Sequence, residues 1–464
     1  MESLSQRLAR HVLAVRYEDL PPSVVAATKA SLLDAIGVTL AASGIGEGCD
    51  AFVDLARESG GRPESLILGH GFKVAARDAA LANGAMAHAL DFEDAFDGAP
   101  LHPNAPVIPA LLALAQARGG VSGKDLITAL AVGCDLVCRI GLCLTAPMEK
   151  RGWYPPPMFG AYGAAAVSSR LLSLTEAQVL DAFSLTLCQS TCSGELKSSP
   201  RSLMRAVRDS FAAQAGVVSA QLAKRGVVGF DLPFEGKAGF FSLYADGAYD
   251  PDILTGGLGQ RFYGEDVSFK AWPACRGTHA FIEASLDIRR EPGFAIAEVA
   301  SIHGEGLELL WMLMQPQAQK RAPKTAIDAK FSLPFTIAAA LIDGAVTLDS
   351  FTPAMMARTD ILALAERVDY ATVPDWGQDR MASGRLEVRM ADGTVHRREI
   401  LNAFGHPTNP IGLETLVAKF KDCGRRAAKP YSDAALDRLA ERILSIETLD
   451  DAGAGLFDGL DLSA

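Results

Sequence analysis

The sequence predicts a mainly α-helical protein, in which both ends of the chain build a large all-helical domain and a smaller α+β lid domain is inserted between them. Two observations carry this prediction. Small and apolar residues recur at helical spacing through the first half of the chain and again after residue 405. Residues 385–400 instead form two alternating segments about an Asp392-Gly393 turn, the pattern of a β-hairpin. We therefore expect a helical domain over 1–265 and 405–464, with a lid over 266–404.

Helices follow one another along the first part. Pro21-Pro22 precedes the first long helix, and Gly226 ends the last one. The alanine-rich composition lets such helices pack closely in a bundle. Helices are predicted over Ser23–Ala42, Ala75–Leu90, Ile108–Ala117, Val179–Gln189 and Ser210–Lys224, and a buried helix pair is predicted within Leu126–Met148.

The character of the chain changes after about Asp266. The lid is predicted to contain a strand, a helix and the hairpin, in the order Glu298–Leu310, Phe331–Leu341 and Arg385–Ile400. Two helices follow, at Leu413–Lys421 and Asp433–Ile446, and the last dozen residues are expected to fray.

Composition excludes several classes of protein. With 49% hydrophobic and 21% charged residues among 464, the chain is expected to be globular. A net charge of −11 without a basic run argues against a nucleic-acid partner. We predict no signal peptide and no membrane-spanning segment. Eight scattered cysteines without a secretion signal favour reduced thiols in the cytoplasm.

The first candidate site is an acidic segment between two histidines. Asp91, Glu93 and Asp94 lie between His88 and His102, at the predicted end of a helix. Carboxylates at a helix C-terminus oppose the helix dipole, and such a violation of local stability is expected at functional sites. A solvated acidic loop is the alternative. Asp91 and His102 are also able to bind a divalent metal, but the sequence offers no obvious third ligand.

Three further segments contain groups suited to proton transfer or to binding carboxylates. Tyr154 precedes three prolines and is able to donate a proton. Arg201, Arg205 and Arg208, at spacings of four and three, are predicted to line one helical face that holds carboxylates, with Lys197 just before them. A packed loop and a solvated basic face are the respective alternatives. The last segment surrounds a Trp-Pro turn and contains Lys270, Cys275, Arg276 and His279; a plain domain-junction turn is the alternative there.

Other enzyme classes lack their motifs in this chain. The phosphate-binding pattern GxxxxGK[ST] is absent, as are a GxGxxG after a strand and the H-E-x-x-H of metalloproteases.

Taken in order, these segments resemble the MmgE/PrpD family, which includes 2-methylcitrate dehydratase, cis-aconitate decarboxylase and iminodisuccinate epimerase. The resemblance covers nearly the whole chain. It rests on Asn83-Gly-x-x-x-His88-x-x-Asp91-Phe-x-Asp94, His102-Pro103, Phe159-Gly160, Lys270-x-Trp-Pro-Ala-Cys275 and Ala329-Lys330-Phe331-Ser332 near Asp343-Gly344. It implies a helical domain with an α+β lid, an active site between them, a homodimer, and no metal or organic cofactor.

The resemblance also implies the chemistry. Asp91, His102 and Lys270 match the family's site residues. We predict a lyase or isomerase, dehydratase-like or epimerase-like, that moves a proton next to a carboxylate of a small di- or tricarboxylic acid. His102 is the expected acid or base, oriented by Asp91, with Tyr154 opposite and Lys270 as carboxylate contact or base. Contacts with substrate are further expected from Arg205, Arg208, Lys197, Cys275 and Arg276.

Two rival functions remain open. Tyr154, Arg205 and Cys275 replace residues that family members often carry, namely a histidine, a lysine and a histidine. The replacements at Tyr154 and Arg205 motivate the first rival, a non-catalytic carboxylate-binding paralogue. The second rival is a metal-dependent hydrolase that uses Asp91 and His102.

Overall fold

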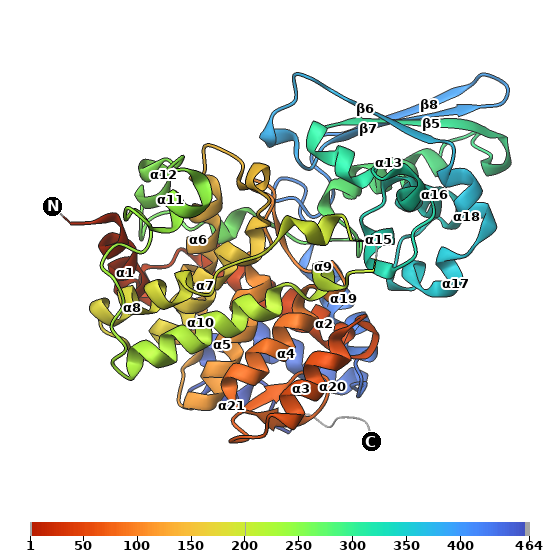
Figure 1. The fold of residues 1–464 in the computed structure, drawn as a ribbon. Coiled ribbons are helices and arrows are strands. Elements are labelled where there is room, and N and C mark those ends of the chain that lie inside the picture. Colours follow the sequence, from red (N-terminus) through yellow and green to blue (C-terminus); the bar gives the residue numbers. More distant parts are fainter. Residues whose placement is uncertain (1, 200, 460–464) are drawn as a thin grey trace.

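The computed structural model describes residues 2–199 and 201–459 and confirms the predicted fold class, a mainly helical protein with a small mixed sheet in its C-terminal part. Figure 1 shows a large helical body beside a smaller lid that carries the sheet on its outer side. The body contains α1 (Leu4–Ala14), α2 (Pro22–Ile45), α3 (Cys49–Glu58), α4 (Ala76–Ala89), α5 (Asn104–Arg118), α6 (Gly123–Leu142), α7 (Pro155–Leu171), α8 (Glu176–Leu187), α9 (Met204–Val207), α10 (Asp209–Lys224), α11 (Phe240–Ala245) and α12 (Pro251–Thr255).

Local sequence signals set several of these helix starts. Ser122 accepts a hydrogen bond from the Asp125 amide at the start of α6, and Thr175 forms a capping box with Gln178 at the start of α8. Pro22 stands in the first turn of α2, where its missing N–H is not needed.

Small residues let the central helices of the body approach closely. At Gly163 of α7 an added Cβ would lie 2.4 Å from Val137 of α6, and at Gly133 of α6 it would lie 2.5 Å from Val167 of α7. No side chain fits at such distances, so the glycines set the spacing between the two helices.

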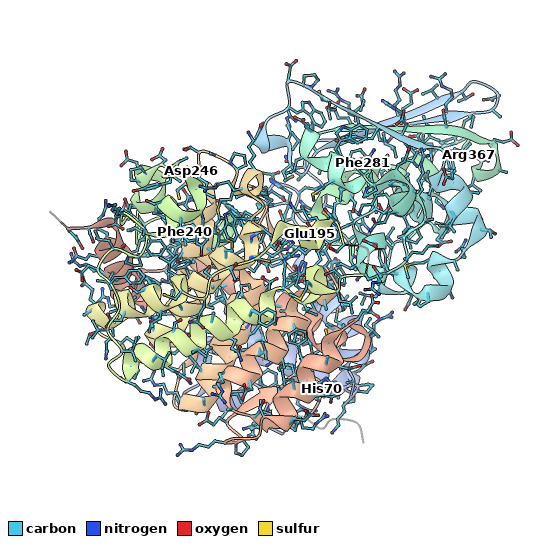
Figure 2. All side chains as sticks on the ribbon, viewed as in Figure 1. His70, Glu195, Phe240, Asp246, Phe281 and Arg367 are labelled. Carbon is cyan, nitrogen blue, oxygen red and sulfur yellow. The ribbon has the colours of Figure 1, made fainter. Side chains whose placement is uncertain are left out.

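The lid contains helices and a four-stranded sheet. Its elements are α13 (His279–Arg289), β5 (Val299–Gly306), α14 (Gln317–Arg321), α15 (Ala326–Lys330), α16 (Leu333–Asp343), α17 (Pro353–Met356), α18 (Thr359–Ala365), β6 (Val368–Thr372), β7 (Gly384–Met390) and β8 (Val395–Ile400). The strand order is β6-β5-β7-β8, with β5 parallel to β6 and the other pairs antiparallel. Phe281 of α13, labelled in Figure 2, packs under the sheet, where a Cβ on Gly384 would lie 2.9 Å from its ring.

The chain then returns to the body. Helix α19 (Leu413–Arg425) packs against α2, α20 (Asp433–Leu444) packs against α19 and α2, and α21 (Ala452–Gly455) packs against α5. Two small antiparallel pairs complete the fold, β1 (Ser65–Ile67) with β2 (Phe72–Val74), and β3 (Ala95–Phe96) with β4 (Val267–Ser268). The β3–β4 pair joins the segment after α4 to the start of the lid.

The structure corrects two of the predicted elements. Residues 126–148 do not form a helix pair, because the single helix α6 continues to Leu142 across an internal ion pair between Asp135 and Arg139, whose atoms are 2.6 Å apart. The strand predicted to reach Leu310 ends at Gly306. Its parallel neighbour β6 ends opposite that residue, so the following residues have no strand to pair with and form a 3-10 helix, Glu308–Leu313.

Helix α2 is long and apolar enough to cross a membrane by length and composition. However, 78% of its most apolar window is buried inside the protein, as in the core helix of a globular domain. All eight cysteines are free, and Cys188 is exposed rather than buried.

Candidate active site

The site is built around the segment that follows α4, residues 90–97, which we call the strap. Helix α4 ends at Ala89, and Asp91 takes a left-handed backbone conformation with φ of 49°. Left-handed geometry is costly for a residue other than glycine and is concentrated at functional sites. The strap then pairs as β3 with β4, which brings Lys270, two residues beyond β4, against Asp91.

Asp91 and Lys270 form a fully buried ion pair. The Lys270 ammonium donates to the Asp91 carboxylate at 2.6 Å and to the Asp91 carbonyl at 2.9 Å. Burial disfavours the charged form of both groups, but the attraction between the opposite charges is the larger effect. Lys270 lowers the pKa of Asp91, and Asp91 and Glu93 raise the pKa of Lys270. Both groups are therefore charged at neutral pH.

Glu93 lies between two imidazoles. His88 Nδ1 contacts the Glu93 carboxylate directly, and His102 Nδ1 lies 2.9 Å from the same oxygen and 2.8 Å from the Asp94 carbonyl. Because both groups facing His102 Nδ1 are acceptors, that nitrogen carries the hydrogen and Nε2 is left with the free lone pair. The prediction that Asp91 orients His102 is thus wrong; Glu93 does so, because Asp91 is turned toward Lys270.

Burial differs sharply between the two histidines. His88 is fully buried, and burial together with Arg208 lowers its pKa to about 3, so it stays neutral. The four side chains of His88, Asp91, Glu93 and His102 form what we call the cluster. Among them the His102 side chain is the most accessible, with 14% exposure. Burial opposes the charge of Glu93, but His88 and Lys270 hold its pKa well below the usual range.

Arginines 205 and 208 lie beside this cluster. Arg208 donates to the Arg205 carbonyl at 3.1 Å, and its guanidinium lies 3.5 Å from His88 Nδ1. The guanidinium of Arg205 lies 3.4 Å from the centre of the Phe331 ring of the lid, while its Nε and Nη2 are buried without a hydrogen-bond partner in the described part of the chain. The predicted face shared with Arg201 is wrong, because α9 begins only at Met204 and Arg201 is exposed in the preceding turn.

Tyr154 lies within reach of two cations. The Arg208 guanidinium is 5.0 Å and the Lys197 ammonium 5.1 Å from the centre of its ring. Burial raises the pKa of Tyr154, so the phenol stays protonated at neutral pH. Burial also lowers the pKa of Lys197.

Cys275 and Arg276 differ in their surroundings. Cys275 is half-buried, its amide donates to the Lys330 carbonyl at 3.0 Å, and burial followed by Asp91 raises the pKa of its thiol. Arg276 pairs with Asp97 at 3.1 Å and donates to the carbonyls of residues 403 and 404. The guanidinium of Arg276 thus links the lid to the strap through Asp97. The predicted contact of Arg276 with substrate stays a prediction.

Four side chains of the cluster could hold a metal ion. One ligand atom from each of His88, Asp91, Glu93 and His102 lies within 4.8 Å of all the others. The structure thus supplies the third and fourth ligands that sequence reasoning did not find. Two cations, Lys270 and Arg208, already contact this group and oppose a further positive charge.

Comparison with known proteins identifies the family. The profile of the MmgE/PrpD N-terminal domain matches residues 6–251, and that of the MmgE/PrpD C-terminal domain matches residues 272–444. The chain belongs to the MmgE/PrpD family. This confirms the resemblance drawn from the motifs.

Relatives in this family share about a quarter of their residues with the chain. The cis-aconitate decarboxylase-like protein oryM of Aspergillus oryzae is 26% identical over 97% of this chain and 95% of its own length. The cis-aconitate decarboxylase of Homo sapiens is 25% identical over 97% and 93%, and that of Aspergillus terreus is 23% identical over 94% and 91%.

Sequence reasoning missed three groups of this MmgE/PrpD site. Glu93 and His88 lay inside the quoted motif, but nothing in their spacing showed which carboxylate faces which imidazole. Lys320 gave no sequence signal at all. It is 2% exposed, and burial followed by Arg205 lowers its pKa to about 8. No hydrogen bond or ion pair of its ammonium is found within residues 2–199 and 201–459, and Asp328 is the carboxylate whose charge acts on it.

A cavity of about 510 Å³ reaches Arg208 from the surface of the body. It is lined by Pro157 and Phe211 and by residues 189–193, 195, 196 and 199, among them Glu195, which Figure 2 labels near the junction with the lid. Arg208 forms part of its wall, although the side chain of Arg208 is buried.

Proposed function

We propose that the protein is a cofactor-independent enzyme that moves a proton at the carbon next to a carboxylate of a small di- or tricarboxylic acid. One observation carries this proposal: His102 is held through Nδ1 by Glu93 and the Asp94 carbonyl, which leaves Nε2 as a base beside a group of cations. This is the arrangement that carbon-acid chemistry requires.

The charges around the cluster support an anionic substrate. The cations around it are Lys197, Arg205, Arg208, Lys270, Lys320 and Lys330. Asp91 and Glu93 are two ionised acids among them. A third, Asp209, lies 3.5 Å from Arg208, and burial raises its pKa to about 6. A buried excess of positive charge is costly without a counter-ion. Substrate carboxylates would supply that counter-charge at Arg205, Lys197 and Lys320.

The reaction starts at His102. Its Nε2 takes the proton from the carbon, the electron pair of the C–H bond passes into the adjacent carboxylate, and Glu93 stabilises the imidazolium that forms. Protonation of the opposite face by Tyr154 gives inversion. Departure of a hydroxyl from the next carbon, protonated as it leaves, gives an alkene and water.

The activity named for the relatives fits the same site. In a decarboxylation the C–C bond breaks, CO2 leaves, and the electron pair that stays on carbon takes a proton from protonated His102 or from Tyr154. All three outcomes share a carbanion next to a carboxylate. Replacement of family residues at Tyr154, Arg205 and Cys275 favours the inversion and dehydration that we predict from the sequence over decarboxylation.

A metal-dependent hydrolase is the second candidate, because four possible ligand atoms lie within 4.8 Å of one another. The ammonium of Lys270 on Asp91 and the guanidinium of Arg208 near His88 disfavour it, since a divalent ion would have to displace or outweigh both cations.

The test is proton exchange in deuterated water. The purified protein is incubated with a panel of di- and tricarboxylates that includes cis-aconitate, and the products are followed by NMR. Deuterium at the carbon next to a carboxylate supports the proposal, and the accompanying inversion, loss of water or release of CO2 assigns the reaction. If no member of the panel exchanges and one of them still raises the melting temperature, the protein is a binding paralogue.

A further inference from the structure

Three lysines donate to three successive carbonyls of the strap. Lys330 Nζ lies 2.5 Å from the Leu90 carbonyl, Lys270 Nζ lies 2.9 Å from the Asp91 carbonyl, and Lys419 Nζ lies 2.6 Å from the Phe92 carbonyl. The ammonium groups are buried, with 2%, 0% and 7% exposure of the residue or its side chain. We call these three residues the lysine clamp.

The lysine clamp provides hydrogen-bond donors for the carbonyls of residues 90–92. The carbonyl of Leu90, the C-cap of α4, has no partner within the helix, and the next residue, Asp91, takes a left-handed conformation that is costly for most residues other than glycine. A helix C-terminus also attracts positive charge. Three charge-assisted hydrogen bonds therefore stabilise a backbone path that the local sequence does not favour.

The three lysines come from different parts of the molecule. Lys270 and Lys330 belong to the lid, whereas Lys419 is on α19 of the body, which packs on α2 and pairs there with Asp34 at 2.6 Å. Lys419 also donates to the Lys270 carbonyl at 2.9 Å. The position of the lid is thus linked to the path of the strap.

In the part of the chain that the structure describes, Lys330 forms no ion pair with a carboxylate. Burial lowers its pKa to about 8, opposed by Asp91 and Glu93 and assisted by Lys270, while Cys423 of α19 faces it from the body. Its ammonium also lies 5.1 Å from the centre of the Phe351 ring. Within the described residues, the Leu90 carbonyl is its hydrogen-bond acceptor, so holding the strap accounts for a buried charge that is otherwise costly.

We propose that Lys330 is a positioning residue, which acts with Lys270 and Lys419 to hold the strap so that Glu93 faces His102 only when the lid is seated on the body. The inference rests on the proposed function for its effect on turnover. Its effect on the strap itself does not depend on that function.

A cavity between lid and body gives the strap room to move when the clamp is weakened. It has a volume of about 840 Å³, and Leu90, Ala206 and Lys330 are among the residues that line it. The Lys330 side chain therefore closes one side of this space against the start of the strap.

The experiment is hydrogen–deuterium exchange of Lys330→Met, read on peptides that cover residues 88–101. Loss of one charge-assisted hydrogen bond is expected to speed exchange of the strap amides by roughly tenfold or more, with helices α6 and α7 unchanged. Lys330→Arg, which keeps a charged donor, is expected to recover most of the protection. Lys324→Met is the matched control, because Lys324 is an exposed lysine of the same lid segment.

Turnover provides the second measurement. Lys330→Met is expected to lower kcat by roughly tenfold while KM stays within about threefold, as for a residue that positions the acid–base group rather than the substrate. If Lys330→Met does not fold, Lys330→Gln, which keeps a neutral donor, is measured in the same way. Unchanged exchange of the strap in a folded variant overturns the inference. If the wild-type protein acts on no carboxylate, the proposed function fails, and exchange of the strap still decides the role of Lys330.

Discussion

Replacing Glu93 with glutamine keeps the shape of the side chain and removes its charge. Glu93 contacts Nδ1 of His88 and lies 2.9 Å from Nδ1 of His102, and its own side chain is buried. A hydrogen bond to a charged group contributes about 1–1.5 kcal/mol more than a neutral one. For two such bonds the loss is about 2–3 kcal/mol, which corresponds to a rate roughly 30- to 160-fold lower if both bonds support the imidazolium of His102.

The assay is the rate of deuterium incorporation into whichever carboxylate the wild-type protein exchanges. Glu93→Gln is compared with Glu58→Gln, which removes an exposed acid of α3. We expect the Glu58 variant to match the wild type. A Glu93→Gln rate within about threefold of wild type would refute the reasoning, because it would show that the charge of Glu93 does not stabilise the imidazolium of His102.

Stability gives an independent check on the same variant. Because the pKa of Glu93 is lower in the folded protein than its reference value of 4.5, its contribution to stability is complete above pH 4.5 and is lost as the pH falls well below it. Glu93→Gln should therefore lower the free energy of unfolding by about 3 kcal/mol at pH 7. The difference should shrink in acid.

Three further predictions concern substrate binding, the lid and metals. Lys320→Met should raise KM roughly tenfold or more with little change in kcat, whereas Lys324→Met should change neither. Because carboxylate binding needs the charged form of Lys320, the wild-type affinity should fall as the pH rises through about 8, and Lys320→Met should lose this dependence. A double-mutant cycle of Asp97→Asn and Arg276→Gln, followed by urea denaturation, should give a coupling energy of about 1–3 kcal/mol; no coupling together with a raised KM for Arg276→Gln would instead support its contact with substrate. Incubation with EDTA should leave the exchange rate unchanged, and a stoichiometric metal ion whose removal abolishes exchange would favour the hydrolase.

Much of the fold follows from local patterns in the sequence. The hairpin of β7 and β8 was predictable because alternating strands flank an Asp-Gly turn, and α10 was predictable because its helical spacing ends before Gly226. The end of β5 at Gly306 was not predictable, since it depends on where a parallel neighbour 60 or more residues away stops pairing. The end of a strand depends on where its neighbouring strands stop pairing, and the local sequence does not identify those neighbours.

The candidate site, like the fold, could be predicted from the sequence only in part. The segments of Asp91, His102 and Lys270 stood out because each is dense in chemical groups, and the resemblance to the family singled out these three residues within them. The structure brings the segments together. Which carboxylate serves His102 depended on the left-handed turn at Asp91, which sends that side chain to Lys270 and leaves Glu93 facing the imidazoles. Lys320, isolated in the sequence, becomes part of the site only through the packing of the lid.

The central claim is that His102 Nε2 exchanges protons with the carbon next to a substrate carboxylate. The most direct measurement is the deuterium exchange rate of His102→Gln, with ligand affinity determined on the same sample. We expect the rate to fall by about 100- to 10,000-fold while the dissociation constant stays within about threefold of wild type. A variant that exchanges at the wild-type rate would show that another group carries the proton and would contradict the account.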